Sequence, residues 1–201
     1  MKPVGLIIPT RWEAGEALKR FHFKREQHHR YRARIGGRDV LLILSGVGAE
    51  PARQAAYDLC AAGVGELVSA GFCGALVPNL DMGSLVTHRL TTVPHPVKTA
   101  AERQALAEKT SAVAVDMETQ AIVEAGTRRG LPVRILRVVS DRREDDLTPL
   151  FGSDGEFSAW RIALRLLNPA VWPLAARLRR QSRLAALRLA DAVEALLKST
   201  S

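Results

Sequence analysis

The sequence predicts a three-layer α/β/α domain around a central mixed β-sheet, on the basis of three observations. Apolar runs typical of buried strands alternate with stretches of helical spacing up to Asp141. Glycine-containing turns separate several of these runs from the next helix, as in α/β units. The 201 residues, 47% apolar and 25% charged, can bury a substantial core, which excludes a disordered chain or a small disulfide scaffold.

The N-terminal part of the sequence contains three candidate strands and one candidate helix. Gly36-Gly37 is a turn signal between a stretch of alternating polar and apolar residues and a continuously apolar run, the pattern of a hairpin whose second strand is central. A second glycine-containing turn, 45–48, directly precedes a stretch of helical spacing that Gly63 ends. We therefore expect strands at 4–8, 30–35 and 40–44 and a helix at about 51–62.

The middle of the chain continues this alternation. Short apolar runs lie on either side of the segment 71–74, and a longer run leads to Asp141. A helical stretch closes at Gly130, with Pro132 beyond it. We expect strands at 67–70, 84–87, 111–115 and 133–139, and helices at about 101–110 and 117–129.

The composition changes after Asp141. A charged loop and a connector rich in Gly, Ser and Asp lead to two helical stretches, separated at Asn168-Pro169. Apolar residues fall mostly on one face of the second stretch, so it packs against another part of the protein; they are Leu174, Leu178, Ala185, Leu189, Ala192 and Leu196. No repeat or second domain is indicated, and we expect one domain over 1–201 with a basic helical extension from about 157.

The net charge of +8 is unevenly distributed. From residue 157 to the end there are eight Lys or Arg and two acids, and a second basic cluster occupies 20–38. A basic surface favours anionic partners in general, including phosphates, nucleic acid and anionic lipid. Because no basic groove interleaved with aromatic residues is present, we expect no nucleic-acid partner.

The cysteine, histidine and hydropathy patterns exclude further classes of protein. Only Cys60 and Cys73 occur, and His22, His28 and His29 lie in a basic stretch without a carboxylate cluster, so we expect no metal site. The apolar run near the start is too short for a signal peptide, and no stretch approaches the ~18–20 apolar residues that cross a bilayer. We expect a reduced, cytoplasmic protein whose contact with a membrane could only be peripheral.

Ligands of open α/β sheets collect at the carboxyl ends of strands. Asp141 follows a nearly continuous apolar strand, and it is either a functional acid or a helix cap or loop acid. Asp116 and Glu118 lie at the start of an expected helix, where acids also complement the helix dipole without any catalytic role. Gly46-x-Gly48 lacks the third glycine of a dinucleotide fingerprint and indicates such a site only weakly. The segments expected to end strands are 9–13, 45–48, 71–74 and 140–141.

Four motifs occur in order along the chain: Ser45-Gly46-Val47-Gly48, Gly71-Phe72-Cys73-Gly74-Ala75-Leu76, Ala114-Val115-Asp116-Met117-Glu118 and Arg137-Val138-Val139-Ser140-Asp141. Together they resemble the purine nucleoside phosphorylase and methylthioadenosine/S-adenosylhomocysteine nucleosidase superfamily over roughly residues 4–145, which implies a nucleoside phosphorylase-like fold. The stretch 99–118 and the tail after Asn168-Pro169 are most similar to the hopanoid-associated phosphorylases. These proteins are thought to remove adenine from adenosylhopane.

The resemblance implies roles for residues of these motifs. Asp141 matches the aspartate that protonates the purine at N7, a general acid step worth ~10²–10⁴-fold in rate. Glu118 matches the glutamate that accepts hydrogen bonds from the ribose 2′- and 3′-hydroxyls, and Met117, otherwise interpreted as a core residue, matches the methionine packed on the sugar. Glu13 matches the acid that orients or deprotonates the attacking water. The other implied substrate-binding residues are Phe72, Cys73, Gly74, Asp116 and Ser140.

Two departures from the family pattern affect the expected reaction. Phe72 stands where many relatives have a serine that contacts the nucleophilic water or phosphate, and this favours hydrolysis over phosphorolysis, as does Glu13. The segment 88–112 is shorter than in the nucleosidases, which predicts a pocket open on that side. Such a pocket suits a bulky apolar 5′ substituent, a degenerate site or a site that a partner completes. The candidate phosphate ligands are Arg11, Arg53 and Arg89.

The sequence therefore predicts an enzyme that cleaves the N-ribosidic bond of an adenine nucleoside and releases adenine. Adenosylhopane is the favoured substrate, and methylthioadenosine, S-adenosylhomocysteine and futalosine-like nucleosides are alternatives within the class. No cofactor is expected, and phosphate is retained as an alternative co-substrate to water. The alternative from another class is a non-catalytic nucleoside- or membrane-binding homologue. By resemblance, we expect a homo-oligomer.

The C-terminal helix leaves two interpretations open. It is either packed on the core with a solvated basic face, or it contacts an anionic membrane, which would place the protein at the inner face of the membrane. The residues that suit membrane contact are Arg177, Arg179, Arg180, Arg183, Leu184, Leu187 and Arg188.

Overall fold

Nine strands form one mixed sheet in the computed structural model, which describes residues 1–152 and 164–199. The sheet order is β2-β3-β4-β1-β5-β8-β7, and β9 pairs with β5 and β6. Strand β1 is parallel to β4 and β5, and β9 is parallel to β5, whereas β3 is antiparallel to β4. The strands are β1 (Val4–Ile8), β2 (Lys24–Gln27), β3 (Arg30–Ile35), β4 (Arg38–Leu44), β5 (Glu66–Ala75), β6 (Leu85–Val86), β7 (Leu90–Thr92), β8 (Ala114–Asp116) and β9 (Val133–Asp141).

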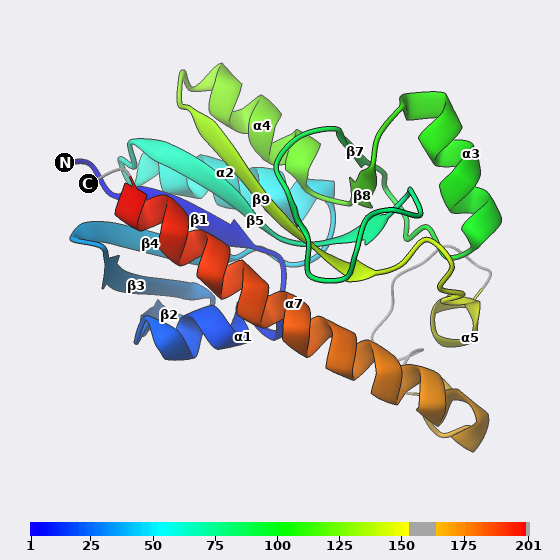
Figure 1. Ribbon diagram of the computed structural model, residues 1–201. Helices are drawn as coiled ribbons and strands as arrows, with labels where there is room; N and C mark the ends of the chain where they lie inside the picture. The colour runs from blue at the N-terminus through cyan, green and yellow to red at the C-terminus, as the bar shows by residue number, and fades with distance from the viewer. Residues whose placement is uncertain (153–163, 200–201) are drawn as a thin grey trace.

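Helices cover both faces of this sheet (Figure 1). Helices α2 and α4 pack together on one face, and α1 and α7 pack together on the other. The helices are α1 (Arg11–Arg20), α2 (Ala49–Ala61), α3 (Ala100–Thr110), α4 (Thr119–Arg128), α5 (Thr148–Phe151) and α7 (Trp172–Ser199), the last preceded by a 3₁₀ turn, Pro169–Val171. The predicted three-layer α/β/α fold with a mixed sheet is confirmed.

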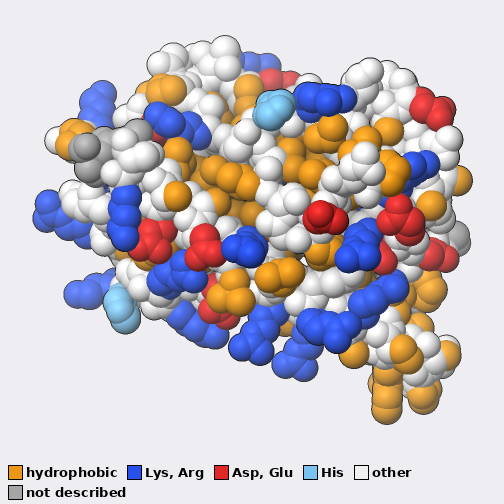
Figure 2. All heavy atoms as spheres, viewed as in Figure 1, with side chains coloured by type: hydrophobic (Ala, Val, Ile, Leu, Met, Phe, Trp, Pro, Cys, Tyr) orange, Lys and Arg blue, Asp and Glu red, His pale blue; other side chains and the backbone are white. Residues whose placement is uncertain are grey.

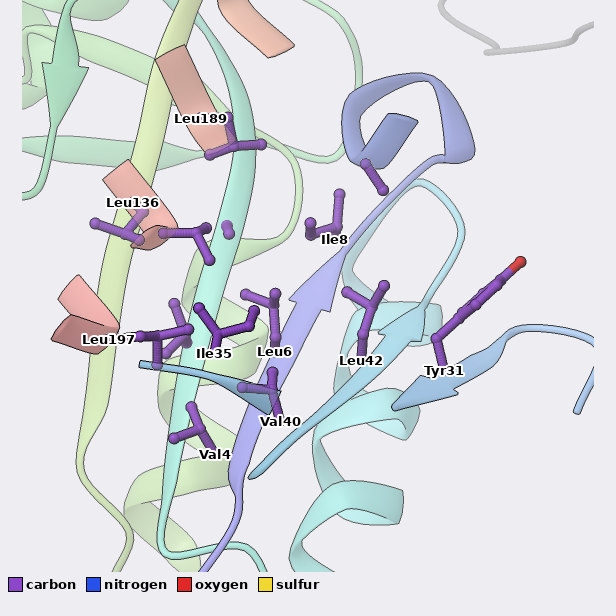
Figure 3. Packing of buried hydrophobic residues seen from close by; sticks show 14 of the residues in the cluster. Val4, Leu6, Ile8, Tyr31, Ile35, Val40, Leu42, Leu136, Leu189 and Leu197 are labelled. Carbon is purple, nitrogen blue, oxygen red and sulfur yellow. The ribbon is translucent and has the colours of Figure 1, made fainter. Parts of the chain in front are cut away.

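Strand β1 is buried on both faces, which explains its continuous apolar run. Leu6 and Ile8 belong to the core that α7 covers, whereas Ile7 belongs to the core on the α2 and α4 side. Because side chains alternate across a strand, a strand between two helical layers needs apolar residues at successive positions. Figure 3 shows Leu6 and Ile8 in one cluster with Leu189 and Leu197 of α7.

Helix α7, 28 residues long, differs in burial between its two halves. Its buried side chains all lie at or after position 185: Ala185, Ala186, Leu189, Ala190, Val193 and Leu197. The predicted apolar face is correct for Ala185 and Leu189, but Leu174 and Leu178 are only half-buried. The core-packed interpretation therefore describes the C-terminal half of the helix.

Three local predictions differ from the structure. The segment 71–74, expected to end a strand, lies inside β5, because β9 pairs with it on one side and β8 pairs at Gly74 on the other. Helix α4 begins at Thr119, so Met117 and Glu118 precede it instead of starting it. Helix α1 was not expected, although Thr10 and Glu13 form a capping box at its start. The helical stretch expected between 157 and Asn168 lies largely outside the described residues.

The described helices fall short of a membrane span. Within residues 1–152 and 164–199, none combines the length and the hydropathy needed to cross a bilayer.

Candidate active site

A cavity of about 320 Å³ lies at the carboxyl ends of β1, β5 and β9, beside the start of α1. This is the edge of the sheet at which ligands of α/β proteins collect. Residues far apart in the sequence meet there, and every predicted catalytic or substrate-binding residue lines the cavity: Glu13, Phe72, Cys73, Gly74, Asp116, Met117, Glu118, Ser140 and Asp141.

The capping box of α1 fixes the buried side chain of Glu13. Its Oε2 accepts hydrogen bonds from the Thr10 backbone N–H and from the Thr10 hydroxyl, both at 2.9 Å. Its Oε1 accepts from the Phe72 N–H at 3.0 Å. Burial raises the pKa of Glu13 to about 6, against the lowering effects of the Phe72 N–H and the nearby Arg137. The carboxyl group is therefore fixed in orientation and exchanges a proton close to neutral pH.

Arg137 on β9 brings two other acids of the site together. Its side chain is fully buried, with Nε 2.9 Å from Asp116 Oδ2 and Nη1 3.3 Å from Glu118 Oε2. Nη1 also donates to the Phe72 carbonyl at 3.3 Å, and Nη2 donates to Ser69 Oγ at 3.1 Å. A buried arginine is tolerated only when such partners compensate for its lost hydration. Arg137 is therefore the structural centre of this group of acids.

Asp116 is occupied by structural contacts. Its Oδ1 accepts from Thr92 Oγ1 at 2.6 Å, and its Oδ2 accepts from the Thr119 N–H at 3.1 Å and from the Thr119 hydroxyl. It thereby binds the first residue of α4 and holds Arg137 in place. These contacts place Asp116 beside the N-terminus of α4, in agreement with the alternative interpretation of an acid that complements the helix dipole.

Glu118 has a different environment, between a glycine loop and Arg137. Its Oε1 accepts from the Gly48 N–H at 2.9 Å, while its Oε2 faces Arg137. Burial raises the pKa of Glu118, and Arg137 opposes this shift. Because each carboxylate oxygen offers two acceptor positions, this side chain can accept further hydrogen bonds from a ligand in the cavity.

Asp141 ends β9 and is held through both carboxylate oxygens. Ser140 Oγ donates to Oδ1 at 2.7 Å, and the Nη1 atom of Arg103 lies 2.6 Å from Oδ2. Arg103 comes from α3, is 1% exposed, and also donates to the carbonyls of Ala75 and Val97. Within the described chain its Nε is buried without a hydrogen-bond partner. The negative charge of Asp141 is thus compensated by an arginine from a separate segment of the chain.

Two glycines of β5 make room for these polar groups. A Cβ atom on Gly74 would lie 2.7 Å from Asp141 Oδ2 and 2.8 Å from Arg103 Nη1. A Cβ atom on Gly71 would lie 2.6 Å from Arg137 Nη1. These glycines, expected to end a strand, therefore lie inside β5 and allow side chains to approach it closely.

The remaining predicted residues contribute in three ways. Phe72 acts through its backbone, which contacts Glu13 and Arg137, while its side chain packs against the core. Burial raises the pKa of the Cys73 thiol, so this side chain is a neutral part of the wall. Met117 is half-buried and lines the cavity, which argues against the simple core interpretation.

The segment 88–112 forms part of the cavity wall despite its shortness. It contributes Val93, His95, Pro96, Val97 and Arg103. This segment and α3 therefore supply part of the wall on that side, and whether the pocket stays open toward a 5′ substituent there remains a prediction.

The three arginines considered as phosphate ligands do not line the cavity. Arg53 pairs with Glu50 and Glu124 on the outer helices, and Arg89 donates to the Ser111 carbonyl. Arg11 lines a separate groove. None of them is placed to bind a phosphate ion in the cavity.

Sequence reasoning did not single out Arg103 or Arg137 as site residues. For Arg137 a signal was present, since a charged residue inside an otherwise apolar strand needs buried partners. For Arg103 the sequence contains no such signal. Its helix is only weakly amphipathic, and its contact with Asp141 depends on tertiary packing.

The geometry provides two carboxylate centres in one cavity, Glu13 with Glu118 around Arg137, and Asp141 with Arg103. Carboxylates in these two positions can exchange protons with a ligand and accept hydrogen bonds from its hydroxyl groups. Within residues 1–152 and 164–199, no group of three or more His, Cys, Asp or Glu side chains is arranged to hold a metal ion.

A family model described as "Phosphorylase superfamily" matches residues 3–88 and 88–163. No curated protein matches the sequence.

Solved structures share the fold at low identity. A putative 5′-methylthioadenosine/S-adenosylhomocysteine nucleosidase from Francisella philomiragia has a TM-score of 0.74 and 16% identity, with 98% of each chain covered. A mutant Helicobacter pylori nucleosidase with 5′-methylthioadenosine in its active site has a TM-score of 0.71 and 14% identity, with 96% of this chain and 99% of that chain covered. Futalosine hydrolase of Helicobacter pylori has a TM-score of 0.70 and 14% identity, with 96% and 97% covered.

Proposed function

Because the chain belongs to the phosphorylase superfamily, we propose that it is a nucleosidase that cleaves the N-ribosidic bond of an adenine nucleoside by hydrolysis. The observation that carries this proposal is the presence of two separate carboxylate centres in one cavity. Cleavage of this bond leaves positive charge on the ribose and negative charge on the departing base. It therefore needs a base for water, acceptors for the sugar hydroxyls and an acid for the purine.

Glu13 is the proposed base that accepts a proton from the attacking water. Its pKa of about 6 leaves it ionised at neutral pH, yet basic enough to take up a proton. The Thr10 and Phe72 hydrogen bonds fix the carboxylate before the substrate arrives, so little reorganisation is needed during the reaction.

Glu118 is the proposed acceptor for the ribose diol. Its orientation is set by the Gly48 N–H and by Arg137, and Met117 beside it offers an apolar surface for the sugar. The negative charge of Glu118 also stabilises the positive charge that develops on the ribose.

Asp141 is the proposed acid for purine N7. Its side chain lines the cavity and is about 16% exposed, so a purine in the cavity can contact it. Because Arg103 binds Oδ2, we assign the transferred proton to Oδ1, the oxygen that Ser140 contacts. In the overall reaction, water and the nucleoside give the free ribose derivative and adenine. Glu13 accepts one proton from the water, and Asp141 donates one proton to the purine.

Water is favoured over phosphate as the nucleophile. Arg103 is the one Lys or Arg among the described residues that line the cavity, and it is already paired with Asp141. Recognition of a phosphate dianion requires charged donors that are available to it. Water requires only the carboxylate of Glu13.

The proposed substrate carries a bulky apolar 5′ substituent, with adenosylhopane as the favoured compound. Support comes from the sequence resemblance of 99–118 and of the tail, and from the apolar side chains that line the cavity beside its polar groups: Trp12, Val93, Val97, Leu147 and Phe151. The nucleosidases and the futalosine hydrolase among the structural relatives suggest methylthioadenosine, S-adenosylhomocysteine and futalosine as alternatives.

The test is release of free adenine from adenosine, methylthioadenosine and an adenosyl lipid analogue, with and without phosphate. Asp141→Asn is the inactive control. Adenine released without phosphate supports the nucleosidase, whereas strict dependence on phosphate would make the protein a phosphorylase. Binding of nucleoside without any adenine release would favour the non-catalytic homologue.

A further inference from the structure

Residues 172–184, at the N-terminal end of α7, include no fully buried side chain. Fully buried positions begin at Ala185, and residues 172–184 form a helical segment of about 20 Å whose inner side chains, such as Leu174 and Leu178, are only half-buried. Arg177 Nη2 contacts Asp145 at 3.1 Å. Because an amphipathic helix normally gains stability by burying one face, this segment is suited to contact an external partner.

A basic groove of about 640 Å³ runs between this segment and α1. Its five cationic side chains are opposed by the single carboxylate of Glu16; they are Arg11, Lys19, Arg179, Arg180 and Arg183. In the part of the chain that the structure describes, the four arginines have no carboxylate within ion-pair distance. The groove therefore presents uncompensated positive charge to an anionic partner.

Exposed apolar side chains lie at the first residue of α7 and in the segment just before it. Leu167 is 75% exposed and Trp172 is 58% exposed, and Leu164 and Leu166 are also exposed. Figure 1 shows this end of α7 extending beyond the sheet, and Figure 2 shows apolar side chains on the same protrusion with Lys and Arg side chains gathered alongside. Tryptophan and leucine beside arginines form the pattern that binds at a membrane interface.

Trp12 connects this surface with the candidate active site. Its side chain is 56% exposed, and it lines both the basic groove and the active-site cavity. A partner that covers the groove would therefore lie next to the entrance of the cavity.

We propose that this surface docks on an anionic phospholipid membrane. The docking surface consists of the groove arginines and Lys19, Trp12 and the apolar end with Leu167 and Trp172. Exposed apolar side chains favour a bilayer over nucleic acid, and the uncompensated like charges disfavour a second copy of the same surface. In combination with the proposed function, on which this part of the inference rests, docking would deliver a nucleoside with an apolar 5′ group directly to the cavity.

The experiment measures partition of the full chain onto vesicles of phosphatidylcholine alone and of phosphatidylcholine mixed with phosphatidylglycerol. We expect binding only to the anionic vesicles, with a decrease as salt is added. The triple variant Arg179→Gln, Arg180→Gln, Arg183→Gln should bind about a hundredfold more weakly, from the contribution of each basic residue near an anionic surface. The matched control Lys24→Gln, Arg25→Gln, Arg34→Gln removes the same charge from exposed positions of β2 and β3 and should bind as the unmodified protein does.

The apolar end has its own test. Leu167→Asn should weaken vesicle binding at high salt, where the electrostatic contribution is screened. Equal losses in both triple variants would overturn the proposal, because they would show a response to net charge alone. Tighter binding to RNA than to anionic vesicles, or a change of oligomeric state with no change in vesicle binding, would also overturn it.

The docking surface and the proposed activity can fail separately. Asp141→Asn should bind anionic vesicles like the unmodified protein, and the groove triple variant should retain adenine release from water-soluble adenosine. Vesicle binding without adenine release from any nucleoside would leave docking supported and contradict the nucleosidase. Adenine release without vesicle binding would support the nucleosidase and contradict docking.

Discussion

Arg103 Nη1 lies 2.6 Å from Asp141 Oδ2, and this ion pair joins α3 to the end of β9. The short segment 88–112 thus supplies a partner for the acid that we place at the purine. Removing one partner of a buried pair leaves the other charge uncompensated.

The first prediction is an energetic coupling between these two residues. A double-mutant cycle with Arg103→Met and Asp141→Asn should give a coupling of about 1–3 kcal/mol in the free energy of unfolding. Urea denaturation of the four proteins measures it. The control Arg143→Met replaces a half-buried residue that contacts Gln104, and it should show no coupling with Asp141→Asn. A coupling near zero for Arg103 would show that the pair does not form in solution.

The second prediction concerns Gly74, which leaves room for the pair. Gly74→Ala places a Cβ atom within 2.8 Å of both charged groups, so Arg103 and Asp141 must shift and adenine release should fall at least tenfold. Gly15→Ala is the matched control, because its Cβ atom meets nothing within 4 Å on helix α1. It should preserve activity and stabilise the protein by up to about 1 kcal/mol. Similar activity in the two variants would contradict the argument.

The fold was largely predictable, because strand burial and helical spacing are properties of local sequence. The errors occurred where tertiary pairing decides the outcome. Gly71 and Gly74 have the composition of a turn, but pairing with β9 on one side and β8 on the other keeps them in a strand. Similarly, the capping box at Thr10 was present in the sequence, yet only the structure shows that Glu13 turns toward Phe72.

The site was predictable in part for a related reason. The motif acids lie at strand ends, and the topology brings such ends together. The arginines that organise them, Arg103 and Arg137, lie within a helix and a strand, where sequence alone does not identify their partners. Motifs therefore identified the residues proposed to meet substrate more readily than the residues that position them.

The third prediction is an acidic limb in the pH dependence of kcat/KM near pH 6. Glu13 must be ionised to accept a proton from water, and burial raises its pKa to about 6. Activity should fall about tenfold per pH unit below that value. Adenine release measured across pH with a soluble nucleoside tests this. If residual activity of Glu13→Gln retained the same limb, the ionisation would belong to another group.

The same shift has a consequence for stability. The folded pKa of Glu13 lies above its ordinary value of 4.5, so the folded protein binds more protons than the unfolded chain between these two values. Stability from this group is present below pH 4.5 and is lost as pH rises through about 6, a loss of about 2 kcal/mol. Urea denaturation between pH 4.5 and pH 7 should show a smaller decrease in Glu13→Gln than in the unmodified protein.

The fourth prediction concerns recognition of the ribose. A hydrogen bond to a charged acceptor contributes about 1.5–3 kcal/mol, so the unmodified enzyme should prefer adenosine over 2′-deoxyadenosine by roughly 10- to 150-fold in kcat/KM. Glu118→Gln should lose most of this preference. The control is Glu124→Gln in α4, the helix that begins directly after Glu118. The Glu124 carboxylate pairs with Arg53, so this variant should keep the preference for adenosine. Equal use of both nucleosides by the unmodified enzyme would contradict the role of Glu118.

The fifth prediction compares two arginines on β9. Arg137 is fully buried against Asp116 and Glu118, whereas the Arg134 side chain is 46% exposed beside Glu66. Arg137→Met should destabilise the protein by about 3–5 kcal/mol, because two acids lose their counter-charge in a buried site. Arg134→Met should cost about 1 kcal/mol or less, since water screens an exposed pair. Urea denaturation of both variants measures the difference, and equal costs would show that Arg137 does not hold the acids together. Arg137→Lys retains the charge but not the planar fork, so it should restore part of the stability without restoring full activity.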